Sequence, residues 1–303
     1  KVDRLNLLRA TEASFGHIFM LYPGSEINDL LARVLPDLQG VELREMFEND
    51  VLQQFWAITD PEVIAAVVEL MAPKVNLIIA DGHHRYETAL NYRDEMRAQY
   101  PDAAANAGFN YCIVTMVSMD DPGLVILPTH RLLTYKKMSG AEALEQAKTY
   151  FEVLPLADRA ALEAALAAAP PEHPTFGFYD GGYAALRLRD AGVLEELLPG
   201  RAEAWRMLDV SVLHEVFIER VLGIDKETIE RKEGIEYLRD VQMGYDAVDG
   251  GEADFLLVMN PTRMAQVRSC TEAAEKMPQK STDFYPKVIS GLVALAVGKE
   301  ERL

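Results

Sequence analysis

Residues 75–88 read VNLIIADGHHRYET, and this stretch joins an apolar run to a helical pattern through a short polar turn. The run at 75–80 is nearly all apolar, which is typical of a strand covered on both faces. From Arg85 to Tyr100, apolar residues return at helical spacing. The stretch therefore predicts a buried strand, a tight turn and a helix that begins at the turn.

The turn itself, Asp81-Gly82-His83-His84-Arg85, has the composition of an anion-binding site. The first N–H groups of a helix have no partner inside it, and the helix dipole adds partial positive charge there. Gly82 removes a side chain where a phosphate would approach closely. His83 and His84 add donors, and Arg85 suits a bidentate phosphate contact. We therefore predict that Gly82, His83, His84 and Arg85 bind a phosphate.

Asp81 has the wrong charge for a phosphate contact. A carboxylate beside phosphates is better explained as a Mg²⁺ ligand or as a base. The alternative is structural: Asp81 caps the helix, and the two histidines fill polar gaps. The gathering of five polar or glycine residues at one strand end favours the functional interpretation.

A second polar cluster, Pro128-Thr129-His130-Arg131, follows the apolar run LVIL at 124–127. Ligands collect at the carboxyl ends of strands, so His130 and Arg131 would meet the first cluster if the two strands share a sheet. We predict that both residues contact the same phosphate compound. The alternative is a surface loop with incidental charges.

A third cluster, Lys280-Ser281-Thr282, is followed by Lys287. One cation, two hydroxyls and backbone donors in a short loop suit a phosphate or a carboxylate. The P-loop pattern GxxxxGK[ST] is absent. The alternative is a helix connection in which Ser281 or Thr282 is an N-cap. The functional interpretation adds all four residues to the predicted phosphate site.

The chain as a whole is predicted to be a mixed α+β protein. Alternating and helical patterns both occur, and the composition becomes rich in alanine near position 138. In the last third, helices are expected to begin at Asp209 and to extend over 235–248, 264–277 and 286–297. Three parts are predicted: a core at 1–137, an alanine-rich α+β subdomain or insertion at 138–200, and a C-terminal helical segment at 201–303 that completes the site.

Composition limits the function. Hydrophobic residues make up 49% and the formal net charge is −18, so the chain supports a sizeable core and is poorly suited to nucleic acid or an anionic membrane. No run approaches the roughly 20 apolar residues that cross a bilayer. Cys112 and Cys270 are isolated, which fits neither a disulfide framework nor a zinc cluster. We expect a cytoplasmic protein whose partner is a small phosphate compound.

Five stretches resemble the family called domain of unknown function 1015: GHIFMLY (16–22), DGHHRYETA (81–89), LPTHRLL (127–133), LDVSVLHE (208–215) and MPQKSTDFYPK (277–287). They span nearly the whole chain. Members of that family carry a further N-terminal segment. The resemblance therefore implies a segment before Lys1, where the chain begins directly in an amphipathic helical pattern.

The DGHHR turn also resembles the corresponding motif of the ParB/sulfiredoxin superfamily, which includes free serine kinases. That resemblance implies a ParB/sulfiredoxin-like core sheet and nucleotide phosphate bound by the residues Gly82 to Arg85. It also implies that Asp81 acts in metal binding or proton transfer, and we place His84 beside it as a second catalytic residue. The expected cofactors are Mg²⁺ and ATP or ADP.

The resulting hypothesis is a nucleotide-dependent phosphotransferase that acts on a small hydroxylated metabolite, with L-serine as the leading candidate. Such transfer needs positioned phosphates, Mg²⁺ and neutralising cations. One alternative is a regulatory protein that binds a nucleotide or metabolite without turnover. A second is a ParB-like nuclease, which the charge of −18 disfavours.

Overall fold

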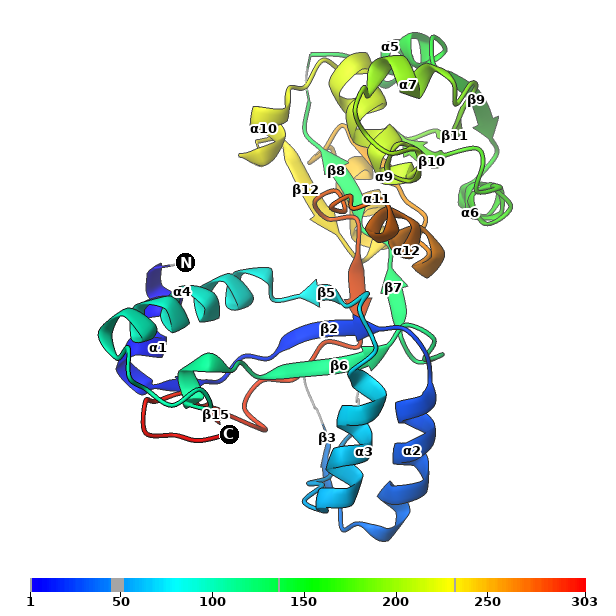
Figure 1. Cartoon of the computed structure of the whole chain (residues 1–303). Coiled ribbons are helices and arrows are strands. Elements are labelled where there is room, and N and C mark those ends of the chain that lie inside the picture. The colour runs from blue at the N-terminus through cyan, green and yellow to red at the C-terminus, as the bar shows by residue number, and fades with distance from the viewer. Residues whose placement is uncertain (1, 45–51, 136, 232) are drawn as a thin grey trace. The chain divides into compact units, whose positions relative to one another are not determined.

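The computed structural model describes residues 2–44, 52–135, 137–231 and 233–303 (Figure 1). The chain forms two compact units, one of residues 1–125 with 286–303 (unit 1) and one of residues 126–285 (unit 2). Each unit contains helices and strands, so the prediction of a mixed α+β fold is confirmed.

Unit 1 is built on a small sheet and the helices around it. Its helices are α1 (Val2–Thr11), α2 (Glu26–Val34), α3 (Pro61–Met71) and α4 (His83–Gln99), with short 3₁₀ turns at Leu35–Asp37 and Gly108–Asn110. Its strands are β1 (Ala13–Ser14), β2 (Ile18–Tyr22), β3 (Val41–Arg44), β4 (Leu52–Phe55), β5 (Ile78–Asp81), β6 (Val114–Ser118) and β15 (Leu295–Ala296). Figure 1 shows α1 alongside α4, and α2 alongside α3.

The central sheet of unit 1 has the order β5-β2-β6. The middle strand β2 runs antiparallel to β5 and parallel to β6. The prediction of a strand covered on both faces at 75–80 is wrong. β5 begins only at Ile78 and is an edge strand, and Val75 is 85% exposed. The first three residues of β5 are only half-buried and Asp81 is exposed, so this apolar run does not mark a strand buried on both faces.

Unit 2 is larger. Its helices are α5 (Gly140–Ala147), α6 (Arg159–Ala167), α7 (Val193–Leu197), α8 (Glu203–Arg206), α9 (Asp209–Val212) with a π-helical continuation at Leu213–Val221, α10 (Lys226–Glu230), α11 (Val241–Asp249) and α12 (Met264–Glu272). Its strands are β8 (His130–Leu133), β9 (Phe151–Leu156), β10 (Thr175–Tyr179), β11 (Tyr183–Leu188), β12 (Ile235–Leu238) and β13 (Phe255–Val258). Strands β7 (Val125–Leu127) and β14 (Asp283–Tyr285) form a separate two-stranded sheet.

One antiparallel sheet with the order β12-β8-β13-β10-β11-β9 organises unit 2. Both of its faces are covered. In β13, Phe255 and Leu257 pack into one hydrophobic cluster, and Leu256 and Val258 pack into the other. Successive side chains of a strand point to opposite faces, so a strand buried on both sides has no polar alternation. This accounts for the continuous apolar run FLLV.

The two compact units meet in the sequence at 125/126 and 285/286, whereas the predicted boundaries are at 137 and 200. β8 precedes position 138, β9 to β11 lie within 138–200, and β12 and β13 follow 200. All six strands belong to one sheet, so these segments share one core. The alanine-rich segment at 138–169 contains helices α5 and α6, which pack on this sheet, and it does not mark the edge of a unit.

Two predicted helices are corrected. Residues 235–238 form strand β12 beside β8, with Ile235 and Leu238 buried, and α11 begins after Asp240, whose carboxylate accepts from the Gln242 amide at 2.9 Å. Residues 286–294 form no helix, because Gly291 has φ of +100°, outside the helical region. Among the described residues, no helix is long and apolar enough to cross a membrane.

Candidate functional site

The DGHHR turn links the end of β5 to the start of α4, as the sequence predicts. β5 ends at Asp81, Gly82 has φ of +94° and ψ of 20°, and α4 begins at His83. This left-handed conformation costs a residue with a Cβ about 1–2 kcal/mol, which explains the glycine. The chain therefore reverses from strand to helix within one residue.

The N-terminus of α4 has no capping side chain. The amides of Arg85 and Tyr86 both donate to the Gly82 carbonyl, at 2.8 and 2.9 Å. The preceding amides, those of His83 and His84, lie before this first helical bond. No side chain caps the helix, and its first turn contains no acidic residue. An anion is the natural partner of such a terminus.

Arg85 is held against this terminus by two glycines. A Cβ on Gly82 would lie 2.8 Å from Arg85 Nε, and a Cβ on Gly16 would lie 3.0 Å from Arg85 Cδ. Arg85 Nη2 donates to Asp81 Oδ2 at 2.9 Å, whereas the buried Nε has no hydrogen-bond partner. The Arg85 side chain is nevertheless 30% exposed, so part of the guanidinium faces solvent at the turn. Gly16, the first residue of the GHIFMLY stretch, thus lies against the DGHHR stretch.

The other polar side chains of the turn face solvent. Asp81, His83 and His84 are exposed, and His84 Nδ1 lies 3.3 Å from Glu87 Oε2. The Asp81–Arg85 ion pair is partly solvated, with the Asp81 side chain 57% exposed, so it contributes little to stability. These side chains remain available to a ligand.

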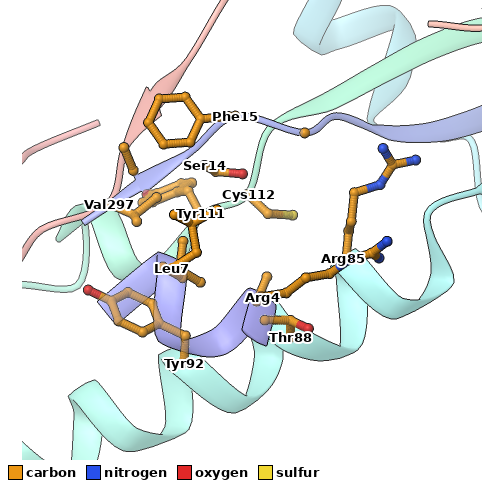
Figure 2. Close-up of a pocket in the computed structure, with 14 residues that line it drawn as sticks. Arg4, Leu7, Ser14, Phe15, Arg85, Thr88, Tyr92, Tyr111, Cys112 and Val297 are labelled. Atoms are coloured by element: carbon orange, nitrogen blue, oxygen red, sulfur yellow. The ribbon is translucent and has the colours of Figure 1, made fainter. Parts of the chain in front are cut away.

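A cavity of about 270 Å³ begins at Arg85 and runs along one face of α4 (Figure 2). Figure 2 shows Arg4 and Arg85 at one end, and apolar and aromatic side chains at the other. The apolar end is formed by Leu7, Phe15, Tyr92, Tyr111 and Val297. Sequence reasoning missed this cavity. The available signal was the spacing of 85, 88, 89 and 92, which lie on one helix face.

In unit 2, His130 and Arg131 belong to strand β8, so the alternative of a surface loop with incidental charges does not hold. Both are buried, Arg131 to 1% exposure. His130 Nδ1 accepts from the Met259 amide at 3.1 Å. Burial, followed by the charge of Arg131, lowers the pKa of His130 to about 4. The imidazole is therefore neutral and is bound inside the protein.

Arg131 connects three separate segments of unit 2. Its Nε donates to His214 Nε2 at 3.1 Å, its Nη2 donates to the Lys280 carbonyl at 2.9 Å, and its Nη1 donates to the Thr129 carbonyl. The guanidinium lies 5.3 Å from the centre of the Tyr237 ring. Among the described residues, no carboxylate forms an ion pair with it, and burial lowers its pKa to about 10.

The Lys280-Ser281-Thr282 loop is held by its backbone. The Lys280 carbonyl accepts from Arg131, and the Ser281 carbonyl accepts from Thr262 Oγ1 at 2.7 Å. Lys280 has φ of +56°, and its side chain is exposed. The buried Ser281 Oγ has no hydrogen-bond partner. The second and third clusters thus meet in unit 2 through Arg131.

The remaining predicted residues lie in unit 1. Lys287 lines a separate cavity of about 460 Å³ there, together with His17 and Thr115. The DGHHR turn also lies in unit 1, whereas Arg131 and Lys280 lie in unit 2. A single pocket formed by all three clusters stays a prediction.

Burial also makes the stability of unit 2 dependent on pH. Burial and the Arg131 charge lower the pKa of His214 to about 3, and burial raises the pKa of Asp209 to about 6. Below pH 6.5, His130 and His214 become protonated in the unfolded chain, whereas both stay neutral in the folded chain until the pH approaches about 4 and about 3. Asp209 acts oppositely, because between pH 6 and 3.8 the folded carboxyl holds a proton that the unfolded one releases. The unfolded state therefore binds about one more proton.

We accordingly expect the unfolding free energy to fall by about 1.4 kcal/mol per pH unit between pH 6 and 4. His214→Gln should abolish this slope, because a Gln oxygen still accepts from Arg131 but does not titrate. Exposed His173→Gln is the control and should leave the slope intact. Urea unfolding followed by Trp205 fluorescence in a Trp56→Phe background measures both. A slope retained in His214→Gln would contradict this assignment.

Asp81, the predicted metal ligand, lies outside any cluster of metal-binding side chains in the described residues. Within the part of the chain that the structure describes, no group of three or more His, Cys, Asp or Glu side chains is arranged to hold a metal ion. Mg²⁺ is commonly held by one or two carboxylates together with substrate phosphates. Asp81 fits that pattern only as one ligand beside a bound phosphate.

Comparison with known proteins identifies the family. The family described as "Protein of unknown function (DUF1015)" matches residues 1–211. The chain belongs to this family. No curated protein matches it.

Solved structures give distant matches. A conserved hypothetical protein from Pyrococcus furiosus is 15% identical, with 92% of this chain and 94% of that chain covered and a TM-score of 0.40. Free serine kinase in complex with AMP is 13% identical, with 90% and 86% covered and a TM-score of 0.39. A mutant of that kinase in complex with ADP is 13% identical, with 90% of this chain and 87% of that chain covered and a TM-score of 0.38. These TM-scores and identities are too low to carry a functional argument, so the function is inferred from the residues of this chain.

Proposed function

We propose that the protein is a nucleotide-dependent phosphotransferase acting on a small hydroxylated metabolite, with L-serine as the leading candidate. One observation carries the proposal: the uncapped N-terminus of α4 has the partly exposed Arg85 guanidinium beside Gly82. Helix amides and a guanidinium together suit the oxygens of a polyphosphate. We further propose that β5-β2-β6 is the ParB/sulfiredoxin-like core sheet.

In this proposal the turn supplies two kinds of group. The amides of His83 and His84, with Arg85, hold the phosphates and neutralise charge as it develops in the transition state. Asp81 holds Mg²⁺ against the phosphates or orients the acceptor hydroxyl, and the exposed His84 accepts or delivers its proton. Mg²⁺, when bound, would neutralise the phosphate oxygens.

The residues of unit 2 receive a revised role. Arg131 positions the loop that carries Lys280, and His130 accepts from the Met259 amide; both are buried, so neither is proposed to touch phosphate. The exposed Lys280 side chain, with Ser281 and Thr282, stays a candidate for the second part of the site. Lys287 stays a candidate from unit 1.

The direct test is to incubate the protein with Mg²⁺, L-serine and either ATP or ADP. Phosphoserine, detected by ³¹P NMR and mass spectrometry, is the expected product. Other amino acids and small alcohols serve as alternative acceptors. Absence of a phosphorylated product with every acceptor and both donors would refute the phosphotransferase proposal.

Arg85→Ala should weaken nucleotide binding by about 10- to 100-fold. Hydrogen bonds to charged groups contribute roughly 1.5–3 kcal/mol, and each 1.4 kcal/mol is a factor of ten. Arg93→Ala is the matched control, because Arg93 lies on the same helix and pairs with its neighbour Asp94 at 2.7 Å. Isothermal titration calorimetry with ATP measures the difference. Equal affinities for the two variants would remove Arg85 from the phosphate site.

A further inference from the structure

The cavity beside the turn follows the geometry of α4. Arg85, Thr88, Ala89 and Tyr92 line it from one helix face, and α1 lines it opposite (Figure 2). Arg85 belongs to both features. Its Cδ packs on Gly16 at the cavity, whereas its Nη2 donates to Asp81 at the turn. A ligand whose anionic end binds at the turn would therefore have its remainder beside this cavity.

The residues that line the cavity indicate the chemistry of the part of the ligand that would bind there. Among the described residues, no acidic side chain lines the cavity, and the two arginines of its lining favour an anionic group. Its far end offers the rings of Phe15, Tyr92 and Tyr111, and its near end offers Arg4 and Arg85. Aromatic rings and guanidinium planes are the surfaces on which nucleobases stack. A flat, neutral ring joined to an anionic group is the ligand that matches both ends.

The size of the cavity also favours a single ring system as its ligand. Its volume of about 270 Å³ lies near the lower limit of the roughly 300–1,000 Å³ usual for ligand pockets. It therefore suits one ring system and not an entire nucleotide. The phosphates would remain outside it, at the N-terminus of α4.

We infer that this cavity binds the base of the nucleotide whose phosphates lie at the DGHHR turn. The inference rests on the proposed function and extends it, because it names the residues that distinguish a nucleotide from a bare polyphosphate. Filling the cavity should weaken binding of a nucleotide without weakening binding of a polyphosphate that has no base.

Ala89→Trp places a large ring in the cavity, and Ala98→Trp is the matched control on an exposed position of the same helix. Dissociation constants of Mg²⁺-ATP and Mg²⁺-tripolyphosphate are measured for each protein by calorimetry. Ala89→Trp should weaken ATP binding by about 10- to 100-fold and leave tripolyphosphate binding unchanged. Ala98→Trp should change neither.

The outcomes separate the inference from the function on which it rests. If Ala89→Trp leaves the ratio of the two affinities unchanged, the base lies elsewhere and only the inference fails. If the wild-type protein binds neither compound, the proposed function fails with it. Should Ala89→Trp fail to fold, Ala89→Leu is used, and a selective loss of ATP affinity is again the expected result.

Discussion

Asparagine in place of Asp81 is expected to lower the rate of phosphoryl transfer by about 10²- to 10⁴-fold, the usual contribution of a positioned acid–base group. Asparagine keeps the size of the side chain and one oxygen acceptor, but it neither takes a proton nor supplies a charge to Mg²⁺. Nucleotide affinity should change by less than about tenfold, or roughly 1.4 kcal/mol. The Asp81–Arg85 ion pair is partly exposed, so its loss disturbs the turn little.

The measurement compares turnover with binding in the same preparation. Phosphoserine formation gives kcat, and calorimetry gives the dissociation constant of the nucleotide. Asp94→Asn is the control, because Asp94 is exposed on the same helix and pairs only with a neighbouring arginine in the described contacts. It should retain full activity.

The same variant separates the two leading functions. A regulator without turnover would bind nucleotide before and after the change, and neither protein would form product. Full turnover by Asp81→Asn would instead show that the carboxylate takes no part in the chemistry. The Gly82 to Arg85 contacts to phosphate would be unaffected by that result.

The turn was predictable because its determinants are local. A glycine between an apolar run and a helical pattern predicts a tight turn and a helix that begins there, and α4 begins at His83, directly after Gly82. The cap of α3 was predictable for the same reason: Asp60 accepts from the Glu62 amide at 2.8 Å. Both features depend on fewer than five consecutive residues.

The burial of Arg131 was not predictable in this way. A His-Arg pair after an apolar run resembles an exposed strand end, yet β8 lies between β12 and β13, whose residues are more than 100 positions away. Only these distant partners decide that Arg131 is inside. The cavity depends likewise on α1 and on Val297, which lie far from α4 in sequence.

The largest effect on stability is expected from Arg131→Ala, which should lower the unfolding free energy of unit 2 by about 3–5 kcal/mol. The change leaves the Thr129 and Lys280 carbonyls and His214 Nε2 without their donor, and each unsatisfied buried group costs about 1–3 kcal/mol. A cavity adds to this cost. Removing a buried charge that has no carboxylate partner offsets part of it.

Arg131→Met isolates the polar contribution, because methionine fills much of the space of the arginine stem. We expect it to destabilise less than Arg131→Ala but still by more than 1 kcal/mol, since the same three acceptors stay unpaired. Arg187→Ala in the same sheet is the control. Its side chain is partly exposed and lies 3.5 Å from Glu152, so the effect should stay below about 1 kcal/mol. Urea unfolding with Trp205 as the only tryptophan measures all three.

The two arginine variants also test whether Arg131 positions the loop. Lys280 holds φ of +56°, a conformation that costs a non-glycine residue about 1–2 kcal/mol, and the bond from Arg131 to its carbonyl helps to hold it there. Without that bond, amide hydrogen exchange at 279–282 should accelerate in Arg131→Met even where unit 2 stays folded. Unchanged exchange in this loop, together with wild-type stability, would mean that the hydrogen bond to Lys280 contributes nothing, and that burial of the guanidinium must serve another group in unit 2.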